Sequence, residues 1–221
     1  MSETIFLIDD DLSVREGLTS LIESVGLPVK TFASGVEFLS LEAAEAEGCL
    51  VLDVEMPGMT GLELQRRMNS AGIFMPIIFL TGHGDIPMTV EAMRAGAVHF
   101  LTKPVREDAL MSAIQQALET DRKTRSDRAE IRKLCERFDL LAPRERQVMR
   151  LVVSGRLNKQ IAHELGISER TIKLYRGQIM RKMCAESLAD LVKQAEKLGP
   201  RRLGTRNEAE VSQASSSSRS A

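Results

Sequence analysis

The sequence contains few cysteines and no long hydrophobic segment. Its three cysteines, Cys49, Cys135 and Cys184, form no C-x-x-C pair and show no metal-ligand spacing with the three histidines. We therefore expect reduced thiols and no cysteine-based metal site. No apolar run is long enough to cross a bilayer, and the chain does not open with basic residues followed by an apolar stretch. These absences predict a cytoplasmic protein with no membrane partner.

The formal net charge of −1 hides an uneven distribution along the 221 residues. Residues 1–118 hold 17 acidic and 7 basic side chains, a net of −10, whereas residues 140–199 hold 6 acidic and 12 basic side chains, a net of +6. A basic region is a candidate for binding a polyanion, and nucleic acid is the usual one. A solvated surface of mixed charge is the alternative interpretation, because charge alone does not identify a ligand.

Short apolar runs alternate with amphipathic segments over the first 118 residues. The apolar runs cover residues 4–8, 29–32, 49–53, 77–81 and 98–101. The segments between them carry apolar residues at helical spacing, which is typical of helices that pack on a parallel sheet. We therefore predict an α/β domain at residues 1–120, with a doubly wound, five-stranded parallel sheet and a ligand site at the carboxyl ends of the strands.

The rest of the chain shows helical patterns and no strand pattern. Residues 121–139 are densely charged and lack Gly and Pro, which predicts a solvated helical linker that could pair with a second copy. Residues 140–199 predict an all-α domain of four helices, with Asn158 and Ser168 as caps of the second and third helices and Gly199 at the end of the fourth. Residues 200–221 are rich in serine and are predicted to be disordered.

Acidic side chains follow two of the predicted strands. Asp9, Asp10 and Asp11 end the first strand, and Asp53 ends the third. Carboxylates brought together at one edge of a sheet repel each other unless a cation neutralises them, and a set of oxygen ligands suits Mg²⁺. A carboxylate can also attack phosphorus and form an acyl phosphate.

Two further groups end the fourth and fifth strands at the same predicted edge. Thr81 contributes a hydroxyl and Lys103, just before Pro104, contributes an ammonium group. Each of these residues taken alone has a simpler structural explanation. Together, and in this order, they predict a phosphoryl-transfer site.

These motifs resemble the receiver domain of two-component response regulators over residues 3–120. The segments that carry the resemblance are Ile8–Asp11, Asp53–Gly61, Thr81-Gly82 and Ala95–Pro104. The resemblance implies that Asp53 accepts a phosphoryl group from a histidine kinase. It also implies that Asp10, Asp53 and the Glu55 main-chain carbonyl hold Mg²⁺, with Asp9 supporting the ion through water.

The same resemblance assigns a switch to three residues. Lys103 would contact the phosphoryl oxygens, Thr81 would hydrogen-bond one of them, and Phe100 would then rotate and change the face made by the fourth helix, the fifth strand and the fifth helix. Two nearby histidines are not assigned to this chemistry. We interpret His83 as a loop residue rather than a regulator of hydrolysis, and we expect His99 to face solvent or a dimer surface.

The basic segment 140–199 resembles the LuxR-type helix-turn-helix. The matching segments are Pro143–Val148, Asn158–Ala162, Leu165–Ser168, Thr171–Lys173 and Ile179–Met183. The resemblance implies that the third helix enters the major groove of DNA and that the fourth helix dimerises. The DNA-binding residues it implies are Lys173 and Arg176 in the groove, with Lys159, Thr171 and Arg181 at the backbone, and Ser168 and Arg170 completing the set.

Two positions depart from the LuxR pattern. Ala142 stands where a Ser or Thr cap is usual, so the first helix of this domain should begin less firmly. Tyr175 stands where a histidine is frequent, so the base specificity of relatives does not transfer directly. The structural alternative for the whole segment is a helical bundle that binds protein.

Together the two halves resemble a NarL/FixJ-type response regulator. The predicted function is transcription regulation: phosphorylated Asp53 drives formation of a homodimer that binds paired half-sites in promoter DNA, with RNA polymerase as an expected partner. Such a chain is no enzyme beyond catalysing its own phosphorylation and dephosphorylation. One alternative is a phosphotransferase of the haloacid-dehalogenase type, because residues 9–13 loosely match D-x-D-x-[TS]. Another is a DNA-binding protein that does not depend on phosphorylation.

Overall fold

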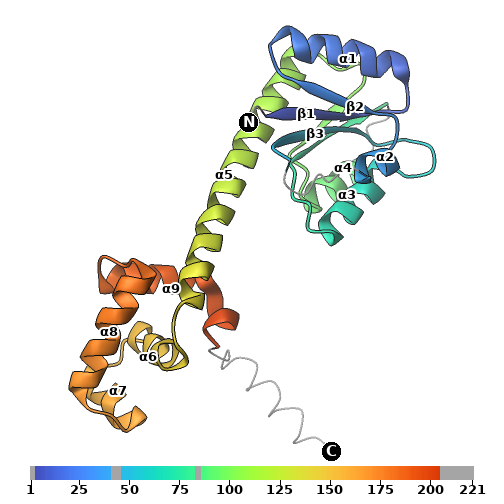
Figure 1. The fold of residues 1–221 in the computed structure, drawn as a ribbon. Coiled ribbons are helices and arrows are strands. Elements are labelled where there is room, and N and C mark those ends of the chain that lie inside the picture. The colour runs from blue at the N-terminus through green and yellow to red at the C-terminus, as the bar shows by residue number, and fades with distance from the viewer. Residues whose placement is uncertain (1–2, 41–45, 83–85, 205–221) are drawn as a thin grey trace, which may run out of the picture. The chain divides into compact units, whose positions relative to one another are not determined.

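The computed structural model describes residues 3–40, 46–82 and 86–204, and the chain divides into two compact units, residues 1–125 and 126–221 (Figure 1). His83 lies outside the described residues. Within the described ranges, no helix is both long and apolar enough to span a membrane.

The first unit is built on five parallel strands in the order β2-β1-β3-β4-β5. The strands are β1 (Thr4–Ile8), β2 (Val29–Phe32), β3 (Gly48–Asp53), β4 (Ile77–Thr81) and β5 (His99–Thr102). This arrangement confirms the predicted doubly wound α/β fold. The first, second and fourth strands have the predicted bounds, β3 begins one residue earlier, and β5 lies one residue further along the chain.

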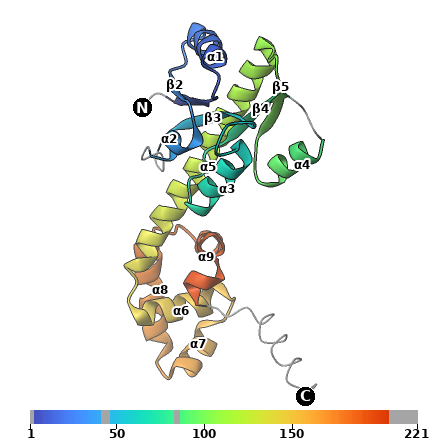
Figure 2. The same ribbon diagram turned by 90° about the vertical axis from the view of Figure 1, so that its right-hand side faces the viewer.

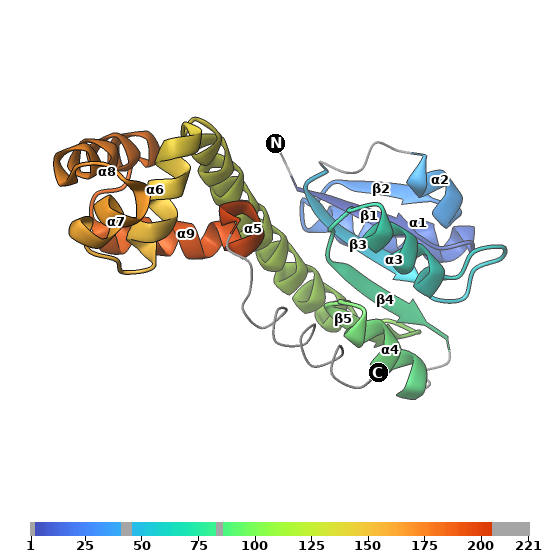
Figure 3. The same cartoon turned by 90° about the horizontal axis from the view of Figure 1, so that it is seen from below.

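Helices cover both faces of this sheet, as Figure 3 shows from below. They are α1 (Leu12–Ser24), α2 (Gly35–Leu39), α3 (Gly61–Ser70), α4 (Ile86–Arg94) and α5 (Glu107–Asp139). Successive strand residues face opposite layers, so Ile5 and Leu7 pack with α1 and α5, whereas Phe6 and Ile8 pack with α2, α3 and α4. The three central strands, β1, β3 and β4, are buried on both faces, which explains why their runs in the sequence are almost entirely apolar.

Helix α5 has 33 residues and includes the whole predicted linker, residues 121–139. The carboxylate of Asp121 is buried and accepts hydrogen bonds from the Gly48 amide at 3.1 Å and from Arg125 Nε at 2.7 Å. Further along the helix, Leu134 and Phe138 are buried in the core of the second unit. The prediction of a helix was correct, but the segment is not solvated along its whole length because both of its ends carry buried side chains.

The second unit is all-α, as predicted (Figure 2). Its helices are the end of α5, α6 (Pro143–Val153), α7 (Asn158–Leu165), α8 (Glu169–Met183) and α9 (Leu188–Leu203). Two predicted boundaries need correction. Leu157, not Asn158, is the N-cap of α7. Gly199 is a kink with φ 74° rather than an end, and the chain continues to a buried Leu203, so the predicted disordered tail begins too early. Residues 205–221 lie outside the described part of the chain.

Candidate functional site

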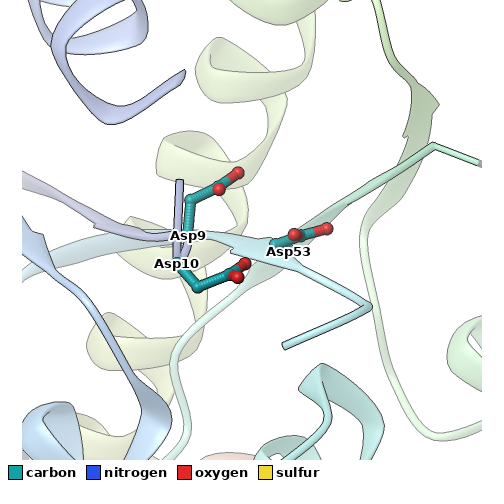
Figure 4. Close-up of side chains that lie close together, drawn as sticks. All are labelled: Asp9, Asp10 and Asp53. Atoms are coloured by element: carbon teal, nitrogen blue, oxygen red, sulfur yellow. The ribbon is translucent and has the colours of Figure 1, made fainter. Parts of the chain in front are cut away.

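Three carboxylates meet at the carboxyl edge of the sheet. Asp9 and Asp10 follow β1, and Asp53 ends the neighbouring strand β3, which pairs with β1 through Ile8 and Leu52. One ligand oxygen from each of the three acids lies within 4.8 Å of the other two (Figure 4). Asp9 is 0% exposed and Asp53 5%, whereas Asp10 is open to solvent. The structure therefore brings together the acidic residues that the sequence placed at strand ends.

Lys103 completes this cluster from the loop after β5. Its Nζ lies 2.6 Å from Asp9 Oδ2 and 3.2 Å from Asp53 Oδ2. Its backbone amide donates to the Thr81 carbonyl at 2.7 Å, which ties the loop to the end of β4, and the Lys103–Pro104 peptide is cis. Thr81 itself is fully buried at the end of its strand. The carboxyl ends of β1, β3, β4 and β5 thus each place one or more of these residues at the same edge of the sheet.

Local backbone geometry shapes the site. Asp11 caps α1 by accepting hydrogen bonds from the Ser13 and Val14 amides. Its carboxylate therefore serves as a helix cap and is not one of the three clustered acids. Gly61, the first residue of α3, lies so close to β3 that a Cβ there would be 2.4 Å from the Asp53 carbonyl oxygen. A glycine is therefore required for α3 to begin directly beside the acidic edge.

The cluster carries more negative than positive charge. Burial raises the pKa of Asp53, and the hydrogen bond from Lys103 opposes this rise without cancelling it. Burial alone would lower the pKa of Lys103, but its hydrogen bonds to Asp9 and Asp53 outweigh that effect and raise it, so the ammonium stays charged. Three carboxylates facing one ammonium form a donor set that suits a hard divalent cation.

The predicted switch residue Phe100 is half-buried on β5. Its ring centroid lies 6.2 Å from that of Phe79, and it packs against the α2–α4 side of the core. Its neighbour His99 is half-buried, and its Nε2 lies 2.8 Å from Gln116 Oε1 on α5. His99 therefore contacts α5.

At the acidic cluster, the backbone amide of Glu55 lies 3.4 Å from Asp53 Oδ1.

The predicted DNA-binding residues fall into two groups. Lys159, Arg170, Lys173 and Arg181 are exposed, as a surface that meets DNA requires. Ser168 and Thr171 instead shape the start of α8: the Ser168 hydroxyl accepts from the Thr171 amide at 3.1 Å, and the two hydroxyls lie 2.8 Å apart. Ser168 is thus the N-cap that the sequence predicted.

Arg176 differs from the prediction. It was expected to point away from the apolar face of α8, but it follows Ile172 by four residues and precedes Ile179 by three, and both isoleucines are buried. Arg176 is half-buried on that same stripe, and its Nη1 donates to Asn158 Oδ1 on α7 at 2.9 Å. Charge alone suggested an outward side chain, whereas helical spacing, if given more weight, would have placed it inward.

An ion pair between Glu145 of α6 and Lys182 of α8 was not predicted from the sequence. Glu145 is 3% exposed, and its Oε2 accepts from the Ala142 amide and from Lys182 Nζ, each at 2.6 Å. Burial raises the pKa of Glu145, but these hydrogen bonds outweigh burial and lower it. Ala142 makes no side-chain cap, as expected, and Glu145 supplies the stabilisation from within the helix. The signal in the sequence was a Glu three residues after the cap position.

Comparison with known protein families gives two matches that together cover most of the chain. The response regulator receiver domain matches residues 5–115, and the luxR family of bacterial regulatory proteins matches residues 139–195. This chain is a response regulator with a LuxR-type DNA-binding domain. The family regulates transcription.

Relatives of this response regulator match nearly its whole length. It is 50% identical over 195 residues to nodulation protein W of Bradyrhizobium diazoefficiens, covering 88% of this chain and 86% of that protein. It is 43% identical over 195 residues to the transcriptional regulatory protein FixJ of the same organism, covering 88% and 95%. A solved structure of the response regulator StyR is 49% identical, with a TM-score of 0.78 over 89% of this chain and 100% of that one.

The family matches also imply two kinds of partner for this response regulator. A receiver domain implies a kinase partner, and a LuxR-type domain implies DNA binding. The buried Asp121 and the Gly199 kink lie beyond the matched ranges, residues 5–115 and 139–195.

Proposed function

We propose that a histidine kinase phosphorylates Asp53 in a Mg²⁺-dependent reaction and that the acyl phosphate switches the binding of promoter DNA. The observation that carries this proposal is the meeting of Asp9, Asp10, Asp53 and Lys103 at one sheet edge. Three acids with ligand oxygens within 4.8 Å, beside the Lys103 ammonium, fit the charge and the oxygen preference of Mg²⁺. Asp10, Asp53 and the Glu55 main-chain carbonyl would hold the ion, with Asp9 supporting it through water.

The chain's own residues would carry the transfer. A carboxylate oxygen of Asp53 attacks the phosphorus, an O–P bond forms, and the P–N bond to the kinase histidine breaks with its electron pair returning to nitrogen. Bound Mg²⁺ supplies positive charge beside the phosphoryl oxygens. Lys103, already 3.2 Å from Asp53, is placed to contact one of these oxygens. The receiver would catalyse both this step and the later hydrolysis of its own acyl phosphate.

The new phosphoryl charge would then change the packing of the receiver. The hydroxyl of Thr81 would bind a phosphoryl oxygen, and Phe100 would turn towards the space this opens, which changes the face formed by α4, β5 and α5. Two phosphorylated copies would pair, and two tethered DNA-binding domains would bind paired half-sites far more tightly than one. The homodimer would act in the cytoplasm on promoter DNA, with RNA polymerase as a further partner.

The variant Asp53→Asn tests this proposal. With a small acyl-phosphate donor and Mg²⁺, we expect the wild-type chain to gain one phosphoryl group, seen by intact-mass spectrometry, and its affinity for DNA to rise about tenfold or more. Asp53→Asn should gain neither. Asp108→Asn, a surface acid paired with exposed Arg106, is the matched control and should behave as wild type.

Two results would contradict the proposal. One is phosphorylation at a residue other than Asp53, and the other is full-strength DNA binding by the wild-type chain without any phosphoryl donor. The first would move the acceptor site. The second would favour a DNA-binding protein that does not depend on phosphorylation, and sustained turnover of a small phosphomonoester would favour the phosphotransferase alternative.

A further inference from the structure

The two helices of the helix-turn-helix, α7 and α8, are joined by a hydrogen bond between polar side chains. Asn158 is the first residue of α7, and its Oδ1 accepts from Arg176 Nη1 at 2.9 Å. Both side chains are half-buried. A charge-assisted hydrogen bond shielded from solvent in this way is stronger than one between two exposed groups.

The position of Arg176 on α8 explains why it needs a partner. Ile172, Arg176, Ile179 and Met183 are spaced by four, three and four residues, so they share one stripe of the helix, and the other three members are buried. A guanidinium cannot end in an apolar core without a hydrogen-bond partner. Its stem therefore packs along the core edge while its head reaches the amide of Asn158.

This arrangement leaves the Arg176 guanidinium with donors that can bind an anion. A guanidinium has five N–H donors, and the bond to Asn158 uses one of them. Arg176 is half-buried and is held to α7 by this bond, whereas Lys173 is exposed. The exposed side chain of Lys159 follows Asn158 directly, so a second cation belongs to the same end of α7.

We propose that Asn158 is a positioning residue for DNA binding, which holds the Arg176 guanidinium between α7 and α8 so that it contacts a DNA phosphate. The inference rests on DNA binding through α8 and deepens it. It moves Arg176 from the residues that discriminate between sequences to those that supply affinity, because phosphate contacts carry no direct sequence information. Holding the side chain in place beforehand removes the entropy cost of ordering it on binding.

The test compares full-length variants on two DNA probes. The probes are a duplex that the wild-type chain selects from a randomised pool and a scrambled duplex of the same length. Asn158→Ala should weaken binding to both by the same factor, about fivefold. Arg176→Ala should do the same and reduce the slope of log affinity against log salt concentration by about one. The double variant should bind as Arg176→Ala does, since Asn158 acts only through Arg176.

A second substitution separates positioning from a merely structural role. Asn158→Asp turns the hydrogen bond into an ion pair, so the melting temperature should equal or exceed that of the wild type. DNA affinity should nevertheless fall below that of Asn158→Ala, because the new carboxylate neutralises the guanidinium and repels phosphate. Lys173→Ala is the matched control and should reduce the ratio of the two affinities rather than lower both equally.

Three outcomes would overturn the inference. They are wild-type affinity in Asn158→Asp, additive losses in the double variant, and a changed affinity ratio in Arg176→Ala. Failure of the wild-type chain to select any duplex would instead refute DNA binding itself. The two failures are therefore distinguishable in one set of measurements.

Discussion

Replacing Glu145 with Gln should destabilise the helical unit and leave the receiver unit unchanged. The Glu145 carboxylate accepts from the Ala142 amide and from Lys182, each at 2.6 Å, and Lys182 also donates to the Leu140 carbonyl at 3.2 Å. This one side chain therefore connects the start of α6 with the last turn of α8. Gln keeps the size of the side chain but removes the charge that both donors meet.

The size of the effect follows from burial. Removing one partner of a fully buried ion pair costs about 3–5 kcal/mol. The Glu145 side chain is 4% exposed but that of Lys182 is 38% exposed, so water partly compensates the ammonium that is left behind. We therefore expect a loss of about 2 kcal/mol, which corresponds to a fall of roughly 10 °C in the melting temperature of a unit of this size.

The loss should depend on pH. The folded-state pKa of Glu145 lies below its ordinary value, since the hydrogen bonds from Lys182 and Ala142 outweigh burial. The carboxylate therefore contributes its full stabilisation above the ordinary pKa of a glutamate, about 4.3, and loses it as the pH falls through the lowered value. The difference in stability between wild type and Glu145→Gln should be largest near neutral pH and shrink in acid.

Calorimetry of the full chain tests this prediction, because it gives the melting temperature of the helical unit. Glu164→Gln is the matched control, because its ion pair with Arg156 is exposed on both sides and should contribute less than about 0.5 kcal/mol. Equal melting temperatures for Glu145→Gln and Glu164→Gln would refute the reasoning. So would a loss that does not diminish on acidification.

Two further predictions concern the receiver unit. Gly61→Ala would place a Cβ 2.4 Å from the Asp53 carbonyl oxygen, so we expect a loss of about 2 kcal/mol in urea unfolding and slower phosphorylation of Asp53; wild-type values for both would contradict the close approach. Asp121→Ala removes the acceptor of the Gly48 amide and one of three acidic partners of Arg125, and it should lower the stability of the receiver by about 2 kcal/mol in calorimetry, whereas exposed Asp108→Asn should leave it unchanged.

The fold could be predicted where burial determines the residue pattern. The run Ile77–Thr81 is apolar because helices cover both faces of β4, and its bounds were predicted without error. Helix α2, Gly35–Leu39, has five residues, too few to show helical periodicity, and it was not predicted individually. The Gly199-Pro200 pair indicated a helix end by its local chemistry, yet burial of Leu203 carries the chain on after a kink. Tertiary packing can therefore override a local sequence signal for the end of a helix.

The same distinction holds for the site. The strand-end rule of parallel sheets brought Asp9, Asp53 and Lys103 together correctly, because topology alone decides where strand ends meet. The residue pairs in the helical unit were missed. Asn158 and Arg176 are 18 positions apart and Glu145 and Lys182 are 37 apart, and no periodic pattern relates side chains across such distances.

The buried acids of this chain differ in how their charge is compensated. Among the described residues, four acidic side chains are buried: Asp9, Asp53, Asp121 and Glu145. Glu145 has Lys182 at 2.6 Å, and Asp121 has Arg125 at 2.7 Å, a cation that it shares with Glu3 and Glu47. Asp9 and Asp53 share Lys103, with exposed Asp10 beside them. Two buried carboxylates beside one ammonium are costly unless a further cation compensates them, which supports the proposal that this edge of the sheet binds a divalent cation.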